Sequence, residues 1–240
     1  MILAANSRAR LSRSADDIAR AVALRGLAFR GDHQDQFDDR ATQLLVETED
    51  GTLLACLRLL PLVNGSEIAS SYSATYYDLA PFYTTEGPIV EIGRFCQLPG
   101  VNDPAILRVA WTALAAHVLS NGTKMFIGCS SFRGADPALH LSALAALRAK
   151  YLFPADLQPL PKSPEVFDFA SIPLPDPDPR GIPPLLRSYL AIGGQVSSHA
   201  VIDHQLDTLH VFTALNIAAI PPERARLLTA AVLDGGKGAR

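Results

Sequence analysis

Two charged residues lie in a stretch that otherwise has the pattern of a buried strand. The stretch EIGRFCQLPG begins at Glu91 and carries Arg94 three residues later, and the residues before it, GPIV, are apolar. Charges are costly in a protein core unless they are paired or functional. A carboxylate beside a cleft can accept a proton, and a guanidinium can hold a carboxylate or a phosphate. Glu91 and Arg94 are therefore the first candidates for catalytic residues.

The spacing of these two residues leaves two geometries open. Residues three apart on a regular strand point to opposite faces of the sheet. A bulge at Gly93 would instead turn Glu91 and Arg94 toward one cleft. Such a bulge would also leave backbone N–H groups unpaired, and these are natural donors to developing negative charge. A structural ion pair between Glu91 and Arg94, or another buried arginine, is the alternative.

Two further arginines fall on apolar faces. Arg25 shares a predicted helix stripe with Ile18, Val22 and Phe29, and Arg58 shares a strand face with apolar neighbours. Arg25 either extends its stem along the edge of the stripe or points into a cleft. An arginine can bind a carboxylate with two parallel hydrogen bonds. The polar loop GDHQDQFDDR (31–40) offers partners for these arginines, a site for a cationic substrate, or simply a solvated surface.

The chain alternates between helix and strand patterns. Ser14 can cap a helix that runs to about Phe29, and Asp103 and Pro104 can begin another that ends at Asn121. The second helix is apolar almost all round, which predicts a buried helix. A further helix is predicted at 136–152, and one more at 183–194 closes on two glycines. Strand patterns occur at 42–48, 52–61, within 87–100, and at 124–132, 200–203 and 208–215, and residues 71–83 are aromatic and irregular.

This order predicts an α/β fold with a mixed sheet. Residues 154–184 hold ten of the 18 prolines and indicate an extended connector. The segment 185–230 is too short to stand alone, so its helix and strands should complete the first sheet. We therefore expect one domain over 1–240, with a core at about 14–153.

Composition excludes several classes of protein. The 240 residues are 48% hydrophobic and carry 21 basic against 24 acidic side chains, a net charge of −3. This balance argues against a nucleic-acid partner. No apolar run approaches the length of a membrane span, the start does not resemble a signal peptide, and the three cysteines lack CxxC spacing. We expect a cytoplasmic protein.

Three other kinds of site are disfavoured. No glycine-rich phosphate loop follows a strand. The segment HAVIDHQLDTLH matches no compact metal-ligand spacing, so no metal is expected. Cys129, Ser130 and Ser131 have no predictable base, and they fit the wall of a substrate pocket better than a nucleophile.

The motifs together resemble a known family. LRGLAFR, DQFDD, LLVETEDGTLLACLRLLP and EIGRFC follow the order seen in acyl-homoserine-lactone synthases and their relatives. YSATYYDLAPF, GCSSFRGADPA and PPLLRSYLAIGG narrow the resemblance to bacterial L-ornithine Nα-acyltransferases, over about residues 20–230. It implies a GNAT fold, with a mixed, mostly antiparallel sheet flanked by helices. It also implies transfer of a (3-hydroxy)acyl chain from acyl carrier protein to L-ornithine, giving lyso-ornithine lipid.

The resemblance also implies roles for particular residues. Glu91 would receive the amine, and Arg94 would hold a carboxylate or phosphate nearby. The predicted substrate-binding residues are Arg25, Phe29, Asp35, Asp38, Arg58, Cys129, Ser130 and Ser131, and the predicted carrier-binding residues are Arg108, Lys124 and Arg133. The segment QLPGVNDPAILR lacks the glycine pattern with which most such enzymes cradle the pyrophosphate of coenzyme A. The implied donor is thus the phosphopantetheine thioester of the carrier, with no separate cofactor.

Two alternatives stay open from the sequence. One is a lactone synthase that uses S-adenosylmethionine, although the tryptophan typical of such synthases after the position of Phe29 is absent. The other is a non-catalytic module that binds acylated carrier protein. The amphiphilic product implied by the resemblance predicts peripheral contact with the inner membrane.

Overall fold

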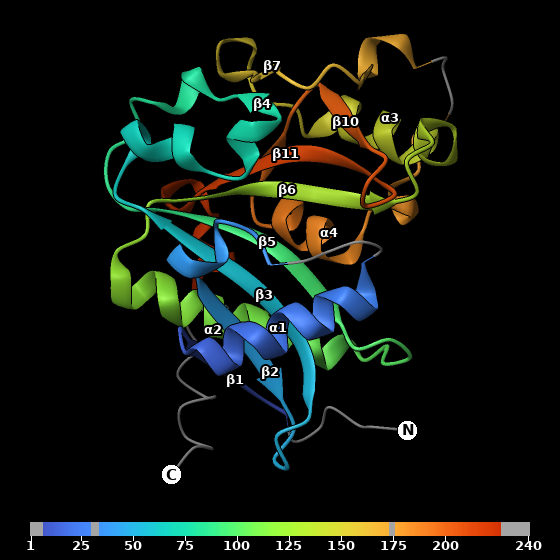
Figure 1. Cartoon of the computed structure of the whole chain (residues 1–240). Coiled ribbons are helices and arrows are strands. Elements are labelled where there is room, and N and C mark those ends of the chain that lie inside the picture. The colour runs from blue at the N-terminus through green and yellow to red at the C-terminus, as the bar shows by residue number, and fades with distance from the viewer. Residues whose placement is uncertain (1–6, 30–33, 173–175, 227–240) are drawn as a thin grey trace.

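A large mixed sheet forms the centre of the molecule (Figure 1). The computed structural model describes residues 7–29, 34–172 and 176–226. Within these residues the strand order is β1-β2-β3-β5-β6-β11-β10-β8, β9 pairs with β11, and β4 and β7 form a separate two-stranded sheet. Positions 31–33, 173–175 and 227–230 of the predicted loop, connector and C-terminal segment lie outside the described residues.

The strands of the main sheet have the following bounds: β1 Arg8–Ser12, β2 Thr42–Glu47, β3 Leu53–Leu62, β5 Ile89–Gln97, β6 Met125–Arg133, β8 Val166–Asp168, β9 Gln195–Val196, β10 His199–Asp203 and β11 Thr208–Asn216. The small sheet consists of β4 Tyr77–Asp78 and β7 Leu160–Pro161. The helices are α1 Ala15–Ala28, α2 Pro104–Asn121, α3 Leu141–Lys150 and α4 Pro184–Ala191.

Most neighbouring strands are antiparallel, and one central pair is parallel. Strands β5 and β6 run parallel over only three residue pairs, which end at Glu91 and Ile127. Strand β11 then pairs antiparallel with β6 over nine residue pairs, and β10 and β8 follow it. The C-terminal helix and strands therefore complete the first sheet, and the predicted mixed, mostly antiparallel sheet is confirmed.

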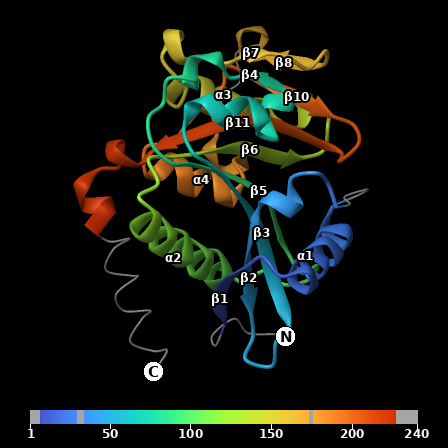
Figure 2. The same cartoon turned by 60° about the vertical axis from the view of Figure 1, so that its left-hand side comes forward.

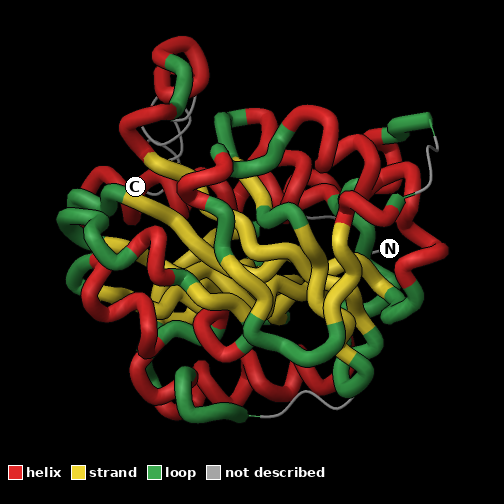
Figure 3. The backbone as a smooth tube through the Cα atoms, turned by 90° about the horizontal axis from the view of Figure 1, so that it is seen from above, coloured by secondary structure: helices red, strands yellow, loops and turns green. Residues whose placement is uncertain are grey.

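Helices cover both faces of the sheet (Figures 2 and 3). Helix α1 packs on one face, where Leu24 joins the buried Leu45, Cys56 and Cys96. Helix α2 packs on the opposite face of the same strands, because Leu44 and Leu54 point toward Ile106. Helices α3 and α4 share this second face over β6, β10 and β11.

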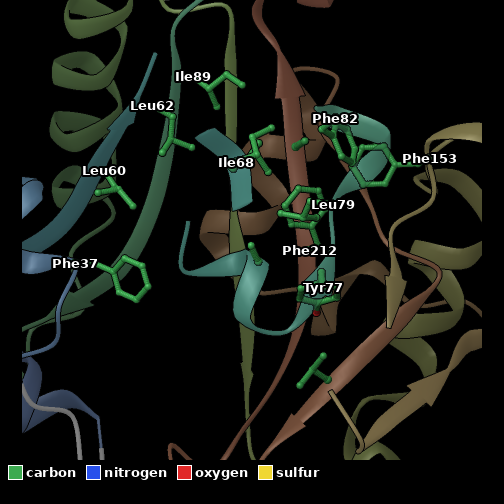
Figure 4. Packing of buried hydrophobic residues seen from close by; sticks show 14 of the residues in the cluster. Phe37, Leu60, Leu62, Ile68, Tyr77, Leu79, Phe82, Ile89, Phe153 and Phe212 are labelled. Atoms are coloured by element: carbon green, nitrogen blue, oxygen red, sulfur yellow. The ribbon is translucent and has the colours of Figure 1, made fainter. Parts of the chain in front are cut away.

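The irregular segment 65–83 closes the first face beyond α1. The segment carries Ile68, Leu79 and Phe82 into a core with Phe153 and Phe212 (Figure 4). Tyr77 lies in the same cluster, with its ring centroid 5.7 Å from that of Phe212. This segment therefore forms one wall of the space in front of β5, β6 and β11.

The local signals explain the helix ends. Ser14 accepts a hydrogen bond from Asp17 N at the start of α1, and Asp103 caps α2 with Pro104 as its first residue. Gly122 ends α2 in the left-handed region with φ +62°. The predicted hairpin at Gly51 is confirmed, with φ +86° at this glycine.

Several predictions of elements were wrong. Strand β1 was not predicted, and the proline-rich connector contributes β8 to the main sheet and β7 to the small one. Helix α3 begins at Leu141, after a 3-10 turn. Helix α2 is not buried all round, because only Ile106, Ala110 and Leu114 are buried and Leu119 is 59% exposed.

Gly128 sets the closest approach between β5 and β6. A Cβ atom at this position would lie 2.1 Å from the carbonyl oxygen of Ile92, just beyond the last residue pair of the parallel ladder. We predict that Gly128→Ala lowers the free energy of unfolding by about 1–3 kcal/mol, because the strands must shift apart. Urea unfolding measures the change. Gly93→Ala is the matched control for stability, since a Cβ at Gly93 meets nothing within 4 Å; equal losses in the two variants would contradict the prediction.

Candidate active site

The parting of β5 and β6 opens a cavity that passes between the two strands. After the pair Glu91 and Ile127 the parallel ladder ends, while β6 stays paired with β11. The cavity has a volume of about 280 Å³, near the lower end of the range for small-molecule sites. Beyond this point β5 and β6 form no further ladder pairs among the described residues, although Ile92 and Gly128 are still in close contact, and residues of both strands border the cavity.

A bulge in β5 turns Arg94 toward the same cavity as Glu91. Cys56 pairs with Cys96 and Arg58 pairs with Gly93, so three steps on β5 oppose two steps on β3. Arg94 takes the extra position with φ +56°, in the left-handed region that glycine normally occupies. The predicted bulge therefore exists, but it lies one residue beyond Gly93. Both Glu91 and Arg94 line the cavity.

Glu91 is buried and fixed by the turn at Tyr72 and Ser73. Its Oε2 accepts a hydrogen bond from Tyr72 N at 2.7 Å, and its Oε1 accepts from Ser73 N at 2.7 Å and from Ser73 Oγ at 2.6 Å. Burial raises the pKa of Glu91, although these hydrogen bonds oppose the rise. Because a carboxylate offers about four acceptor sites, the three bonds leave capacity for one more donor. Its described bonds go to this turn, so an ion pair with an arginine is not what holds it.

The loop segment that carries Asp35 and Asp38 neutralises the buried arginines and does not face the cavity. Arg25 and Asp38 are both fully buried and form two parallel hydrogen bonds of 2.7 Å each. Arg58 Nη1 bonds to Asp35 at 2.6 Å, and Arg94 Nη2 bonds to the other oxygen of Asp35 at 3.1 Å. Burial alone would raise the pKa of both aspartates, but the arginine hydrogen bonds keep each below its ordinary value.

Three of the predicted substrate-binding residues need correction for this reason. Arg25 neither extends its stem along the helix surface nor reaches a cleft, because its side chain is 0% exposed and paired with Asp38. Asp38 is equally enclosed, and Asp35 does not line the cavity. Asp35 bonds to Arg58 and Arg94 from outside the cavity, and the buried pair of Arg25 and Asp38 anchors the loop that carries it. Tyr72 holds the two guanidiniums from the other side, with ring-centroid distances of 5.7 Å and 4.8 Å.

The other predicted substrate residues do line the cavity. They are Phe29, Arg58, Cys129, Ser130 and Ser131. Burial raises the pKa of Cys129 to about 12, so the thiol is protonated at neutral pH. Ser130 Oγ accepts a hydrogen bond from Thr213 at 3.0 Å. This geometry suits a wall of the cavity, as the sequence predicted, and not a nucleophile.

The predicted carrier-binding residues do not form one patch. Arg108, Lys124 and Arg133 are all exposed. Lys124 immediately precedes β6 and Arg133 ends it, so about 30 Å of strand separates them. Arg133 borders a hollow that shares Phe29 and Phe95 with the cavity, whereas Lys124 lies at the other end of the sheet. Of Lys124 and Arg133, Arg133 is therefore the one that lies beside the cavity.

The cavity has a polar half and an apolar half that sequence reasoning did not foresee. Tyr72, His210 and Asp203 join Glu91 and Arg58 on the face under segment 65–83. The opposite half is lined by Ile92, Leu107, Leu185, Leu186 and Tyr189, from β5, α2 and α4. The period-two alternation along 208–215 could have indicated which face of its strand His210 occupies. Only the pairing of the strands shows that this face borders the same cavity as β6.

The described residues contain neither a metal-type cluster nor a helix that could cross a membrane. Among the described residues there is no group of three or more histidine, cysteine or acidic side chains placed to hold a metal ion. Within the same ranges, no helix combines the length and the apolar character needed to cross a membrane.

The arrangement provides the groups that acyl transfer to an amine requires. A buried carboxylate can accept a proton, two guanidiniums can orient an anionic group, and unpaired strand-edge groups border the point where the strands part. An apolar channel on the other side can take a hydrocarbon chain.

Comparisons with known proteins agree with this chemistry. A family model described as an acetyltransferase (GNAT) domain matches residues 23–112. An L-ornithine N(alpha)-acyltransferase of Rhodobacter capsulatus is 27% identical over 95% of this chain and 96% of that protein. One of Rhizobium meliloti is 26% identical over 90% of this chain and 82% of its own length. The solved structure of FeeM, an N-acyl amino acid synthase from uncultured soil microbes, covers 88% of this chain and 92% of its own with 11% identity and a TM-score of 0.49. The resemblance inferred from the motifs is confirmed.

Proposed function

Starting from a chain that contains a GNAT domain and resembles L-ornithine Nα-acyltransferases over nearly its whole length, we propose that it transfers an acyl chain from acyl carrier protein to the α-amine of L-ornithine. The product would be lyso-ornithine lipid. The observation that carries this proposal is the single cavity that joins a carboxylate and two guanidiniums on one face of the sheet to an apolar channel on the other.

Glu91 is the proposed proton acceptor. The α-ammonium of the amino acid must lose a proton before its nitrogen can attack a thioester carbonyl. Burial raises the pKa of Glu91, which brings its basicity closer to that of the group it must deprotonate. The amine nitrogen then forms the C–N bond, the C–S bond breaks, and the phosphopantetheine thiolate leaves and takes up a proton.

Arg94, with Arg58 beside it, is proposed to orient the α-carboxylate. Both guanidiniums line the cavity, and both are held between Asp35 and the ring of Tyr72. A fixed, planar donor suits bidentate recognition of a carboxylate better than a flexible ammonium does. Arg94 thus places the substrate next to Glu91.

The donor is proposed to be a carrier-bound thioester rather than an acyl-coenzyme A. At the N-terminus of α2, where phosphate would gain from free N–H groups, Pro104 lacks a donor and Asp103 accepts a bond from Ala105 N at 2.8 Å. The negative charge of the Asp103 carboxylate at this end of the helix would repel a pyrophosphate. The exposed Arg133, in the hollow next to the cavity, is better placed than Lys124 to contact an acidic carrier. No further cofactor is proposed.

We also propose that the chain acts as one domain, since the cavity draws residues from α1 to β11. The amphiphilic product must reach a membrane, so peripheral contact with the inner membrane follows from the same proposal.

An assay with several acceptors and donors tests the proposed function. Purified protein is given a 3-hydroxyacyl carrier protein together with L-ornithine, other amino acids or S-adenosylmethionine, and products are identified by mass spectrometry. We expect the ornithine amide, and at least 10-fold lower turnover with the matching acyl-coenzyme A because the phosphate cradle is missing. A lactone from S-adenosylmethionine without ornithine amide would favour a lactone synthase. Acyl-carrier binding without turnover of any acceptor would favour a non-catalytic module.

A further inference from the structure

A group of polar side chains on the β10–β11 hairpin lies across the cavity from Glu91. Asp203 and Thr208 are directly opposite in the antiparallel ladder, and His210 follows Thr208 by two residues, so all three belong to one face of the sheet. All three line the cavity, and each is at most 7% exposed. This group, named here the hairpin cluster, plays no part in the proposed acyl transfer.

The side chains of the hairpin cluster have few hydrogen-bond partners among the described residues. The Oγ1 of Thr208 and the Nε2 of His210 are buried, and neither has a hydrogen-bond partner among the described residues. Asp203 accepts one described hydrogen bond, from Leu206 N to its Oδ1 at 2.9 Å. Buried polar atoms are normally satisfied, so unpaired atoms beside a cavity indicate a ligand that supplies the missing bonds.

The hydrogen bonds of Tyr77 fix which kind of atom His210 presents. The Tyr77 hydroxyl donates to the backbone oxygen of His210 at 2.8 Å, and the same hydroxyl lies 3.1 Å from His210 Nδ1. Since its proton goes to the carbonyl, the hydroxyl oxygen accepts from Nδ1–H. The Nε2 atom then carries a lone pair. Burial lowers the pKa of His210 to about 4, so the ring is neutral at pH 7.

The hairpin cluster therefore offers acceptors and a negative charge. Two carboxylates line the cavity in the described part of the chain, and Glu91 is already bonded three times to the turn at 72–73. Asp35 and Asp38, which the sequence suggested for a cationic substrate, already form ion pairs with arginines. Asp203 is the carboxylate left to receive a cation from the cavity.

We propose that Asp203, Thr208 and His210 bind the side-chain ammonium of the acceptor amino acid. An ammonium has three N–H donors, which match a carboxylate oxygen, a hydroxyl oxygen and an imidazole lone pair. This inference rests on the proposed function and adds a specificity subsite to it. It explains how a cavity can select a diamino acid over amino acids with uncharged side chains of the same length.

The spacing along the sheet agrees with this orientation. His210 is paired with Ser131 on β6, two residues beyond Cys129, whose Sγ lies 3.5 Å from the Ser73 hydroxyl that also holds Glu91. Two residues of strand correspond to about 7 Å, a distance that ornithine can bridge when a hydrogen bond at each end is added to its chain of three methylene groups. The α-carboxylate would then lie near Arg94 and the ammonium near Asp203.

Asp203→Asn tests the subsite with two acceptors that share a carbon skeleton, L-ornithine and L-norvaline, which lacks the terminal amine. In the variant we expect kcat/KM for ornithine to fall about 10- to 100-fold, mainly through KM, because a charged hydrogen bond to the bound substrate is lost. The value for norvaline should stay within about 2-fold of wild type. Thr208→Val, a nearly isosteric change, should reduce the preference for ornithine in the same direction.

Asp168→Asn is the matched control. Asp168 is an exposed aspartate on the neighbouring β8, and its Oδ1 accepts a bond from Ala170 N that asparagine can also accept. Equal losses for ornithine and norvaline in a folded Asp203→Asn protein would overturn the subsite, as would an unchanged preference for ornithine.

Calorimetric binding of the two amino acids separates the subsite from the proposed function, because it needs no turnover. Wild-type protein that binds ornithine no more tightly than norvaline contradicts the subsite even if both are acylated. Protein that binds ornithine in an Asp203-dependent way but acylates only another amine retains the subsite and contradicts the proposed function.

Discussion

Replacement of Glu91 by glutamine is expected to lower kcat/KM for acyl transfer by about 100- to 10,000-fold, the range over which a general base contributes. The carboxylate is 4% exposed and lies in the cavity beside Arg94. Glutamine keeps the shape and one acceptor oxygen for the bonds from Ser73, but it cannot take a proton from the amine. Steady-state kinetics with an acyl-carrier donor and ornithine measure the loss. Glu86→Gln, a change at an exposed glutamate before β5, is the control and should keep its activity.

The pH profile distinguishes a proton acceptor from a residue that only positions the turn at 72–73. Burial raises the pKa of Glu91 above the ordinary glutamate value of about 4.3. A base must be deprotonated, so kcat/KM of the wild type should fall as the pH falls through this raised pKa. Glu91→Gln should lack that acid limb. A variant that keeps both its rate and its acid limb would assign the proton transfer to another group.

Residues whose environment depends on local alternation were predictable. Arg58 shares a face with Cys56 and Leu60, and period two along one strand was enough to expect an arginine on an apolar face. The bounds of helix α2 were equally predictable, because its cap at Asp103 and its end at Gly122 depend on residues within one turn of the chain. The α/β architecture with a mixed sheet followed from the order of such local signals, and its GNAT-like form was expected from the resemblance of the motifs.

Features that depend on strand pairing were not predictable in the same way. The bulge fell on Arg94 because the register of β5 is set by β3, whereas sequence alone favoured the neighbouring glycine. Asp203 and His210 seemed to be a weak metal motif, yet pairing with Thr208 and Ser131 places them in a cavity formed mainly by distant elements. Strand β1 has little apolar alternation, and it exists because β2 offers it an open edge.

The sequence offered the loop 31–40 as one possible source of partners for Arg25, but it did not single out Asp38, which lies 13 positions further along the chain. Helix periodicity placed the guanidinium on the apolar face, which made a cost in free energy foreseeable, whereas the fully buried pair that offsets this cost was only one of several alternatives. In the structure one buried pair anchors the loop whose Asp35 then holds Arg58 and Arg94. The stability of this pair and the geometry of the cavity are therefore linked.

Arg25→Met should lower the free energy of unfolding by about 3–5 kcal/mol at pH 7, because it leaves Asp38 buried without its main counter-charge. The hydrogen bonds from Arg25 lower the pKa of Asp38 to about 2, against about 3.9 in an unfolded chain. A lowered pKa gives stabilisation that is complete above about pH 4 and is lost as the pH falls toward 2. The difference between variant and wild type should therefore narrow over that interval.

Urea unfolding at several pH values measures both effects. Arg20→Met on the same helix is the matched control, because Arg20 is 38% exposed and its partners Asp17 and Glu47, although buried, both keep an ion pair with Arg10, so the loss should be only about 0–1 kcal/mol. If Arg25→Met costs no more than Arg20→Met, the buried pair does not anchor the loop. If its cost is large but constant from pH 7 to pH 3, lost packing of the arginine stem, and not the charge of Asp38, accounts for the instability.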